Sequence, residues 1–364
     1  MRAGRQQGSK GERAQGLRIV KDKNRVAVYY RNDDVRIEER PMPKIGPGEL
    51  LMRVEASGIC GSDVMEWYRI KKAPLVLGHE VAGVIEEVGE GVTRFKKGDR
   101  VSAAHHVPCN TCKYCLKGEY SVCDTLRSTN FDPGGFAEYL RLPRINVDRG
   151  VFRLPDEVSF EEGTFAEPLA CVLRGQRIAG LQPGDSVFVL GSGISGLLHI
   201  AAARALGAGR ILAADISQYR LDAARAAGAD AVFLSGKDIP GQLRNANGGL
   251  GADVVIVCTA APPAINAAFR CADRGGRILF FAPSMPGETF PFPLYELWKD
   301  GVNVFFSYAG PPGDTTQAIE LLRSRRVMVQ GMITHRLPLA ETGRGFQLVA
   351  KAQDSIKVII LPQK

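Results

Sequence analysis

The feature that most restricts the fold is a strand, a glycine-rich turn and a helix that follow one another without a break. Residues 186–190 form an apolar run after a Pro-Gly-Asp turn, and an alanine-rich segment ends at Leu206. Between them lies Gly191-Ser192-Gly193-Ile194-Ser195-Gly196. Glycines at these positions allow a tight turn, close approach of a pyrophosphate and close helix–strand packing, and the helix N-terminus faces the phosphates. We therefore predict a dinucleotide-binding site at Gly191, Gly193, Ile194 and Gly196.

The residue that follows the second expected strand indicates which dinucleotide is bound. Residues 211–214 form an apolar run that ends at Asp215. A carboxylate at this point accepts hydrogen bonds from the ribose hydroxyls and repels a 2′-phosphate. The sequence therefore favours NAD over NADP. In the alternative interpretation, Asp215 only caps the following helix, which is compatible with either cofactor.

Further apolar runs recur at the spacing of a doubly wound sheet. Six of them alternate with helical or loop segments, at 186–190, 211–214, 231–234, 253–258, 277–281 and 302–306. This alternation predicts an α/β fold with a parallel six-stranded sheet. Residues 26–150 instead carry Val, Gly and Pro at short intervals, which predicts a β-rich domain with long loops. A chain of 364 residues is long enough for two such domains.

A cluster of four cysteines predicts a structural zinc site. The thiols lie within a short segment, at Cys109, Cys112, Cys115 and Cys123. Four thiolates so close together can enclose one tetrahedral ion. Disulfides would need an oxidising compartment, and the chain shows no secretory signal. An iron–sulfur cluster is the other alternative, but the bacterial cluster motif ends in a shorter gap followed by proline. The sequence favours zinc over both.

A second group of metal-binding residue types is spread over separate segments. Cys60 opens the tetrapeptide Cys60-Gly61-Ser62-Asp63, and His79 and Glu80 follow further along the chain. Mixed sulfur, nitrogen and carboxylate ligands are typical of an open, catalytic zinc site. Glu167 is a further candidate ligand, because an acidic residue among apolar neighbours must be paired or face a metal. The alternative is that Glu167 is an ordinary carboxylate at a helix start.

The charge of the chain is concentrated at its N-terminus. The formal net charge is +8, and residues 1–25 alone hold eight Lys or Arg against two Asp or Glu. We interpret residues 1–25 as a disordered basic extension, because they lack the apolar core of a secretory signal. No run approaches the ~20 apolar residues of a membrane span. We therefore expect a cytoplasmic protein with neither a membrane nor a nucleic-acid partner.

Taken together, these motifs resemble those of the zinc-dependent medium-chain dehydrogenases, the superfamily of alcohol, polyol and threonine dehydrogenases. The resemblance extends from about residue 26 to residue 364, and residues 60–63 and 166–169 favour the sorbitol (L-iditol 2-) dehydrogenase branch. It implies a GroES-like catalytic domain of residues 26–167 and 309–364, and a Rossmann domain of residues 168–308. It also implies two zinc ions per subunit, one catalytic and one structural, and a homo-oligomer, either a dimer or a tetramer.

The resemblance further implies a role for single residues. Cys60 and His79 would bind the catalytic zinc, with Glu80 and Glu167 as ligands either directly or through water. Asp63 would orient the imidazole of His79. The remaining implied roles are proton acceptance by Ser62, a ribose contact by Arg220 and a contact with the cofactor phosphates by Lys357.

The implied reaction transfers a hydride from a secondary alcohol to NAD and leaves a ketone. The substrate would be a polyol, a sugar alcohol or a cyclitol, including aminocyclitols. L-threonine 3-dehydrogenase and simple alcohol dehydrogenase are alternatives of the same chemistry. A non-enzymatic protein that binds zinc and nucleic acid is the alternative from another class, but it would leave the dinucleotide motif without a use.

The chain differs from the sorbitol dehydrogenase branch at positions that bear on the choice of substrate. Many relatives carry a relay histidine where this chain has Met65, and sorbitol dehydrogenases carry a tyrosine at Glu66 and an arginine near Ser307. An acidic Glu66 suits an amino-substituted substrate; the alternative is a solvated glutamate at the pocket rim. Together with Glu66, the candidate pocket residues are Phe131, Asp132 and Trp298. The histidines at 105, 106, 199 and 335 show no metal-ligand spacing.

Overall fold

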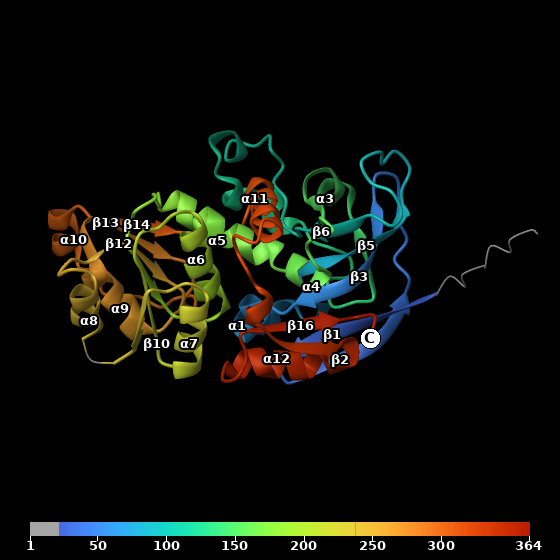
Figure 1. Ribbon diagram of the computed structural model, residues 1–364. Coiled ribbons are helices and arrows are strands. Elements are labelled where there is room, and N and C mark those ends of the chain that lie inside the picture. Colours follow the sequence, from blue (N-terminus) through green and yellow to red (C-terminus); the bar gives the residue numbers. More distant parts are fainter. Residues whose placement is uncertain (1–21, 237) are drawn as a thin grey trace, which may run out of the picture.

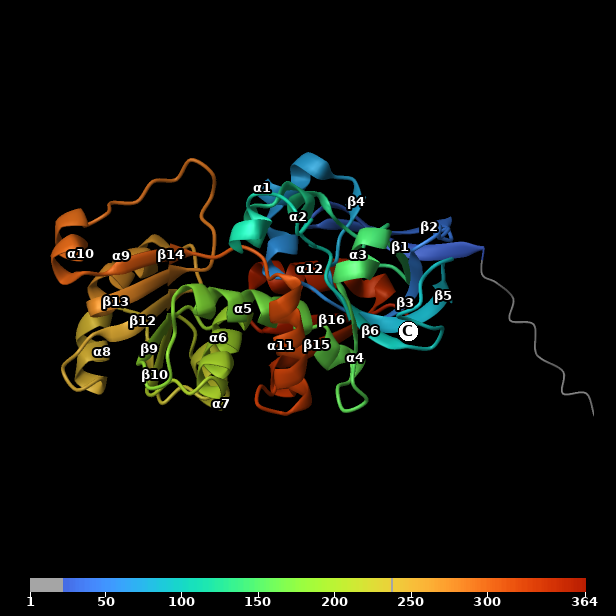
Figure 2. The same ribbon diagram turned by 90° about the horizontal axis from the view of Figure 1, so that it is seen from above.

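The computed structural model describes residues 22–236 and 238–364 of the chain. Two lobes lie side by side (Figures 1 and 2), one built on a parallel six-stranded sheet and the other on a seven-stranded and a three-stranded sheet. Most of the predicted N-terminal extension lies outside the described residues. Strand β1 (Lys23–Arg31) begins before the expected boundary at residue 26, because Lys23, Asn24 and Arg25 already pair with strand β2.

The six-stranded sheet has the order β11-β10-β9-β12-β13-β14, and all its pairs are parallel. The central strand β9 pairs with β10 on one side and β12 on the other, so the chain reverses its direction of winding at β9. The predicted α/β fold and the six predicted strands are therefore confirmed. Their bounds are β9 (Val187–Leu190), β10 (Ile211–Asp215), β11 (Ala231–Leu234), β12 (Ala252–Val257), β13 (Ala272–Phe280) and β14 (Asn303–Phe306).

Strand β13 begins earlier than the apolar run at 277–281 predicts. Ala272 already pairs with Ala252, and the register shifts before Arg277 pairs with Val254. Gly275 has φ +71° within this irregular stretch. The polar and glycine residues of the irregular part carry no apolar pattern, which is why only the regular part could be predicted.

Helices cover both faces of the parallel sheet, as such sheets require. Helix α6 (Ile194–Ala205) starts directly after the glycine-rich turn, and its apolar residues pack in the core with Val187 and Ile211. The other helices of this lobe are α7 (Gln218–Ala226), α8 (Ile239–Ala246), α9 (Pro262–Cys271) and α10 (Leu294–Asp300).

The seven-stranded sheet has the order β15-β16-β3-β5-β6-β8, with β7 also paired to β3. Strand β3 (Leu50–Gly58) is mostly buried because it lies inside this sheet between β16 and β5. Strand β16 (Lys357–Leu361) returns from the C-terminal end and pairs antiparallel with the end of β3. This pairing brings Lys357 next to the first residues of β5 (Glu80–Val88), where the candidate metal site lies.

The remaining strands and helices complete the second lobe. Its other strands are β2 (Asp34–Pro41), β4 (Leu75–Val76), β6 (Arg100–Ala103), β7 (Tyr139–Leu142), β8 (Val151–Arg153) and β15 (Ile333–Pro338). Its helices are α1 (Glu66–Arg69), α2 (Asp124–Ser128), α3 (Arg144–Arg149), α4 (Phe160–Gly163) and α12 (Thr342–Lys351). Within the described ranges, no helix has the length and apolar character needed to cross a lipid bilayer.

Helix α5 (Ala166–Ile178) connects the two lobes. It begins at the second lobe and packs against α6 of the first and against α11 (Pro312–Arg323). The α5–α11 contact is reinforced by an ion pair, in which Arg177 Nη2 lies 2.7 Å from Asp314 Oδ2. Since α5 carries Glu167 at its start, the candidate site lies where the lobes meet.

Candidate active site

A short turn holds Cys60 and Asp63 close together. Cys60 precedes the 3₁₀ turn η1 (Gly61–Val64), and its sulfur accepts the N–H of Ser62 at 3.4 Å. The carboxylate of Asp63 accepts the backbone N–H of Cys60 at 3.1 Å. These two hydrogen bonds satisfy the backbone N–H groups at the start of the turn. They also fix the sulfur and the carboxylate on one side of it.

His79 follows a glycine that no other residue could replace. Gly78 has φ +93°, and a Cβ at this position would lie 2.7 Å from the backbone nitrogen of Phe136. The chain therefore turns sharply before β5. His79 Nδ1 lies 3.4 Å from Asp63 Oδ1. Burial opposes protonation of His79, but the Asp63 carboxylate outweighs burial and raises the pKa of the imidazole. Because Nδ1 faces Asp63, the predicted orienting contact is present and Nε2 is left for a metal.

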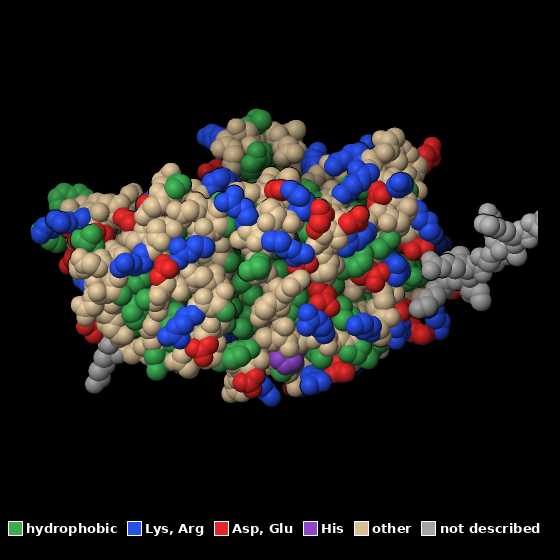
Figure 3. Space-filling view, viewed as in Figure 1, with side chains coloured by type: hydrophobic (Ala, Val, Ile, Leu, Met, Phe, Trp, Pro, Cys, Tyr) green, Lys and Arg blue, Asp and Glu red, His purple; other side chains and the backbone are tan. Residues whose placement is uncertain are grey.

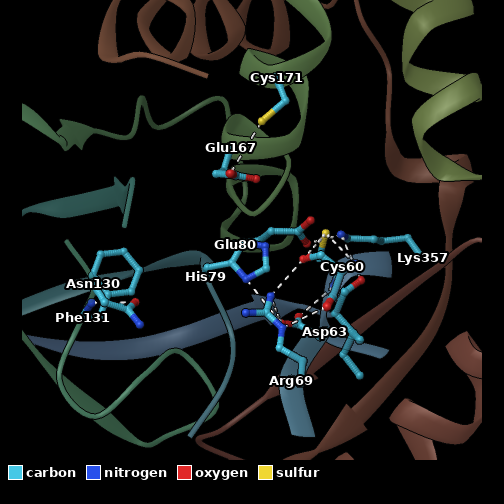
Figure 4. Close-up of polar contacts among 12 residues, drawn as sticks. Cys60, Asp63, Arg69, His79, Glu80, Asn130, Phe131, Glu167, Cys171 and Lys357 are labelled. Atoms are coloured by element: carbon cyan, nitrogen blue, oxygen red, sulfur yellow. Dashed lines mark hydrogen bonds and ion pairs between the residues drawn. The ribbon is translucent and has the colours of Figure 1, made fainter. Parts of the chain in front are cut away.

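Cys60, His79 and Glu80 form one potential metal-binding group. The ligand atoms of all three lie within 4.8 Å of one another, and Figure 4 shows the three side chains converging. Sulfur, imidazole and carboxylate are the donor types that zinc accepts, so this group fits the predicted ion. A position left open among mixed ligands is what a catalytic site needs.

Lys357 lies next to this group and is fully buried. Its side chain has no exposed area, and its ammonium is ion-paired with Glu80 and lies 3.3 Å from the carbonyl oxygen of Ile59. The buried carboxylate of Glu80 is thereby neutralised, as a buried charge requires. The implied contact between Lys357 and cofactor phosphates is not formed in this arrangement, because the ammonium is enclosed. Sequence reasoning could not foresee the pair, since it depends on β16 lying next to β3.

Glu167 faces the same group from α5, above it in Figure 4. Burial raises the pKa of its carboxyl to about 7. Its closest partner is Cys171, one helical turn further, whose sulfur lies 3.6 Å from Oε1. Glu167 is not among the three residues whose ligand atoms lie within 4.8 Å of one another. Binding through water therefore suits it better than direct binding, and its role remains a prediction.

Arg69 is a site residue that sequence reasoning missed. Its guanidinium donates to the carbonyl oxygen of Ser62 at 2.9 Å, to Ser62 Oγ at 3.1 Å and to Asp63 Oδ1 at 3.4 Å. Ser62 Oγ also lies 3.4 Å from the sulfur of Cys60. The hydroxyl that the resemblance assigns to proton transfer is therefore positioned by Arg69 from α1.

The four cysteines of the other motif also converge. The sulfur atoms of Cys109, Cys112, Cys115 and Cys123 all lie within 4.8 Å of one another, and all eight cysteines of the chain are free thiols. The sulfur of Cys109 accepts the N–H groups of Thr111 at 3.4 Å and Cys112 at 3.2 Å. Hydrogen bonds from Thr111 and Cys112 lower the pKa of Cys109 to about 5, which favours the thiolate that zinc binds. The geometry fits a four-sulfur zinc site, and none of the cysteines is joined in a disulfide.

The glycine-rich turn forms the expected cradle at the C-terminal end of β9. Gly191 has φ +93°, and a Cβ at Gly196 would overlap the carbonyl oxygen of Gly191. Gly193 has open space where a Cβ would lie, which leaves room for a phosphate. Asp215 accepts the N–H groups of Ser192 at 2.7 Å and Ser217 at 2.9 Å.

Arg220 reaches across to the other lobe. It lies on α7, and its Nη2 donates to the carbonyl oxygen of Ala352 at 2.7 Å. The implied ribose contact stays a prediction, because the guanidinium donates to protein backbone instead. Arg220 lies on the helix that follows β10, the strand that ends at Asp215.

Three of the four predicted pocket residues differ widely in the exposure of their side chains. Trp298 is 74 % exposed on α10, at the far end of the other lobe (Figure 1). Glu66 is exposed, and its Oε2 accepts the backbone N–H of Asn32 at 3.4 Å. Phe131 is 4 % exposed and contacts His105 edge to face. The assignment of Trp298 and Glu66 to the substrate pocket therefore stays a prediction, and Phe131 packs against a histidine whose ring lies beside that of His79.

Ser307 stands where the sorbitol branch carries an arginine, and it is hydrogen-bonded by an arginine of another element. Arg174 on α5 donates to Ser307 Oγ at 3.2 Å and to Ser121 Oγ at 3.0 Å. Asp132, another predicted pocket residue, is paired with Arg141 at 2.9 Å. Arg174 of α5 therefore places a guanidinium next to Ser307, the position where the resemblance expects an arginine.

Comparison with known proteins agrees with this fold and site. The family model for the alcohol dehydrogenase GroES-like domain matches residues 46–156, and the model for zinc-binding dehydrogenases matches residues 195–324. Sorbitol dehydrogenase of Gallus gallus is 32 % identical over 93 % of this chain and 96 % of its own length. D-xylulose reductase A of Aspergillus niger is 34 % identical over 90 % of this chain and 93 % of its own length.

A solved structure shows the same architecture. The crystal structure of 2R,3R-butanediol dehydrogenase from Bacillus subtilis superposes with a TM-score of 0.82, at 27 % identity, over 93 % of this chain and 99 % of its own. The fold and the site define a zinc-dependent oxidoreductase with a Rossmann domain. The chain belongs to the zinc-binding alcohol dehydrogenase family, and the predicted resemblance is confirmed.

Proposed function

We propose that this enzyme oxidises a secondary alcohol group of a polyol to a ketone and transfers the hydride to NAD, with a catalytic zinc ion. The observation that carries the proposal is the convergence of Cys60, His79 and Glu80 within 4.8 Å at the junction of the lobes. The similarity to sorbitol dehydrogenase and D-xylulose reductase supports a polyol as the substrate. Preference for L-threonine or for simple alcohols is an alternative result of the test described below.

The residues of the site would divide the chemistry among them. When bound, zinc lowers the pKa of an alcohol as a Lewis acid, and the nicotinamide accepts the hydride. Cys60 and His79 would hold the ion, and Asp63 would keep Nε2 of His79 directed at it. Ser62 would take the proton of the substrate hydroxyl and pass its own hydroxyl proton toward the cofactor ribose, with Arg69 fixing the position of Oγ.

We propose NAD as the preferred cofactor because of Asp215. Its carboxylate is 5 % exposed and held by two backbone N–H groups, so it cannot turn away from the ribose position. A 2′-phosphate placed there would meet a fixed negative charge. Gly191, Gly193, Ile194 and Gly196 would bind the pyrophosphate through the N-terminus of α6.

We also propose the finer organisation that the sequence predicts. The four cysteines would bind a second, structural zinc ion. The catalytic domain would comprise residues 26–167 together with residues 309–364, and residues 168–308 would form the cofactor domain. The chains would assemble into a dimer or a tetramer. As the contact between two of them, which the sequence did not predict, we propose the exposed apolar surface at α10 and β14.

The first experiment measures NADH and NADPH formation by the zinc-loaded enzyme. The panel contains xylitol, sorbitol, inositols, aminocyclitols, L-threonine and simple secondary alcohols. A polyol preference, lost on treatment with a chelator and in Cys60→Ser, would support the proposal. A preference for threonine or for simple alcohols would replace the polyol assignment. Absence of turnover in zinc-loaded protein that binds NAD would overturn it.

A further inference from the structure

Two consecutive histidines lie beside the candidate zinc site and have no role in the proposed chemistry. His105 and His106 follow strand β6 and precede the four-cysteine loop. They are neither metal ligands by spacing nor part of the nucleotide cradle. Both are partly exposed, so they are within reach of a bound molecule.

The backbone that carries the pair is pinned from three directions. The buried side-chain amide of Asn146 donates to the carbonyl oxygens of Ala104 at 3.0 Å and His105 at 2.9 Å. Ala104 donates to the carbonyl oxygen of Gly150 at 2.8 Å, and Val107 donates to Thr129 Oγ1 at 3.0 Å. With its main chain held on both sides, the pair presents its rings in a fixed direction, as a recognition site requires.

The rings form a row from the metal group to the other lobe. The ring centroids of His79 and His105 are 4.6 Å apart, and those of His105 and His106 are 3.7 Å apart. His106 in turn lies 6.1 Å from the ring of Tyr308, which follows the C-terminal end of β14. Ligands of such parallel sheets bind at the C-terminal ends of the strands. The row therefore lines the space between the metal site and the cofactor site.

The hydrogen-bonding groups of the pair are available. Nδ1 of His105 is buried and has no partner among the described residues. Burial lowers the pKa of His106 to about 3, so its imidazole is neutral and offers one donor and one acceptor. A hydroxyl group also donates one hydrogen bond and accepts one. A buried polar nitrogen without a partner is costly, and a ligand hydroxyl would remove that cost.

We infer that His105 and His106 bind the hydroxyl group adjacent to the reacting carbon and so select vicinal diols and polyols over monohydric alcohols. The inference rests on the proposed function, since it assumes that the reacting oxygen lies at the Cys60–His79–Glu80 group. His105 lies next to the ligand His79, where the neighbouring carbon of the substrate would be. His106, one ring further out, would bind the same or the following hydroxyl. Phe131 supports His105 from behind.

The test uses two alcohols that differ by one hydroxyl group, 2R,3R-butanediol and 2-butanol. In His106→Leu, the ratio of kcat/KM for the diol over 2-butanol should fall roughly 10- to 100-fold, because a buried hydrogen bond is lost. His106→Gln retains a donor and an acceptor and should recover part of the ratio. His335→Leu, at a histidine on β15 in the same lobe, is the matched control and should leave the ratio unchanged.

A binding measurement separates this inference from the proposed function. Calorimetry gives the Kd of each alcohol for zinc-loaded enzyme with NADH, whether or not either alcohol is turned over. Zinc content per chain is measured for each variant, because His106 packs against His105, whose ring lies beside that of His79. Equal affinity of the natural enzyme for both alcohols would overturn the inference. So would a parallel loss for both alcohols in His106→Leu, which would indicate support of the metal site only.

Discussion

The proposed preference for NAD depends on the fixed negative charge of Asp215. Its two oxygen atoms accept different backbone N–H groups, so the carboxylate cannot move aside for a phosphate. We expect Asp215→Asn to shift the ratio of kcat/KM for NAD over NADP toward NADP by on the order of 100-fold, since a like-charge contact costs several kcal/mol. Steady-state kinetics with both cofactors measure the ratio. Asp222→Asn, on the exposed face of α7, is the control, and an equal shift in both variants would refute the role of Asp215.

The buried imidazole of His199 makes the stability of the fold depend on pH. It is fully buried in α6, where the amide nitrogen of Gln176 lies 3.2 Å from Nδ1, and burial lowers the pKa of its imidazole to about 3. The unfolded chain takes up this proton near pH 6.5 and the folded chain does not, so folding stability falls as pH drops from about 6.5 toward 3.

The corresponding variant is His199→Leu, which has no group to protonate. Between pH 7 and pH 4 its unfolding free energy should fall by about 2–3 kcal/mol less than that of the natural protein. Urea denaturation at pH 7, 5.5 and 4 measures the difference. His335→Leu is the control on a different element. Parallel pH curves for His199→Leu and the natural protein would show that His199 does not contribute.

The residues that sequence reasoning missed share a physical reason. Cys60, His79 and the cysteine cluster could be predicted because short motifs fix their spacing, and the structure brings each set together. Arg69, the His105–His106 pair and the Glu80–Lys357 ion pair depend on which strands become neighbours, and one sequence does not contain that information. The histidine pair did leave one signal, since it directly follows an apolar run and precedes the zinc loop. Trp298 stays a prediction as a pocket residue, because an exposed aromatic side chain near β14 suits a pocket rim and a subunit contact equally well.

At the scale of elements, the loop between β6 and α2 depends on its cysteines for its conformation. Apart from the sulfur cluster, its core contains little besides Leu126, Tyr120 and Ala309. A zinc ion bound there would contribute directly to folding. Arg174 attaches this loop to α5 through Ser121, so loosening the loop also affects the junction of the lobes.

We expect Cys112→Ser to lose one of two zinc ions per chain and to melt at least roughly 5 °C lower. Proteolysis should then cut within residues 109–123 first, because the loop has lost its cross-link. Metal analysis, calorimetry and mass spectrometry of the fragments measure the three effects. Cys60→Ser is the reciprocal control: it should lose the other ion and all turnover while keeping the loop resistant. Unchanged zinc content in Cys112→Ser would contradict a structural ion.

The strands of the parallel sheet were the easiest elements to predict. Each is a short apolar run bounded by turns, because both faces of the sheet are covered and every residue of β9 is buried. The second lobe was predicted only as β-rich, because its strand order depends on long-range returns such as β16 beside β3. The same holds for the site at the junction of the lobes. Its ligand motifs could be predicted from the sequence, but the residues that surround the substrate could not.

At the scale of the whole molecule, charged and apolar side chains are distributed differently over the surface. On the face shown in Figure 3, basic and acidic side chains are interspersed, which gives no continuous basic patch there for nucleic acid. Large apolar side chains instead gather at α10 and β14, at the end of the parallel sheet. The exposed members are Phe292, Leu294, Tyr295, Trp298, Phe306 and Tyr308.

This patch lies beside an edge strand of the six-stranded sheet, since β14 pairs with β13 and with no second strand among the described residues. An open edge beside apolar side chains is a surface that a second copy can cover, and most such assemblies are two-fold symmetric. We therefore expect the natural protein to have twice its chain mass of 39.4 kDa, or a multiple of that, in light scattering. Phe306→Glu should halve the mass, because a charge would then be buried at the symmetric contact. Leu234→Glu, on the opposite edge strand β11, tests the same charge at an exposed apolar residue and should leave the mass unchanged. A natural protein that is monomeric, or a Phe306→Glu variant of unchanged mass, would show that this edge does not join the subunits.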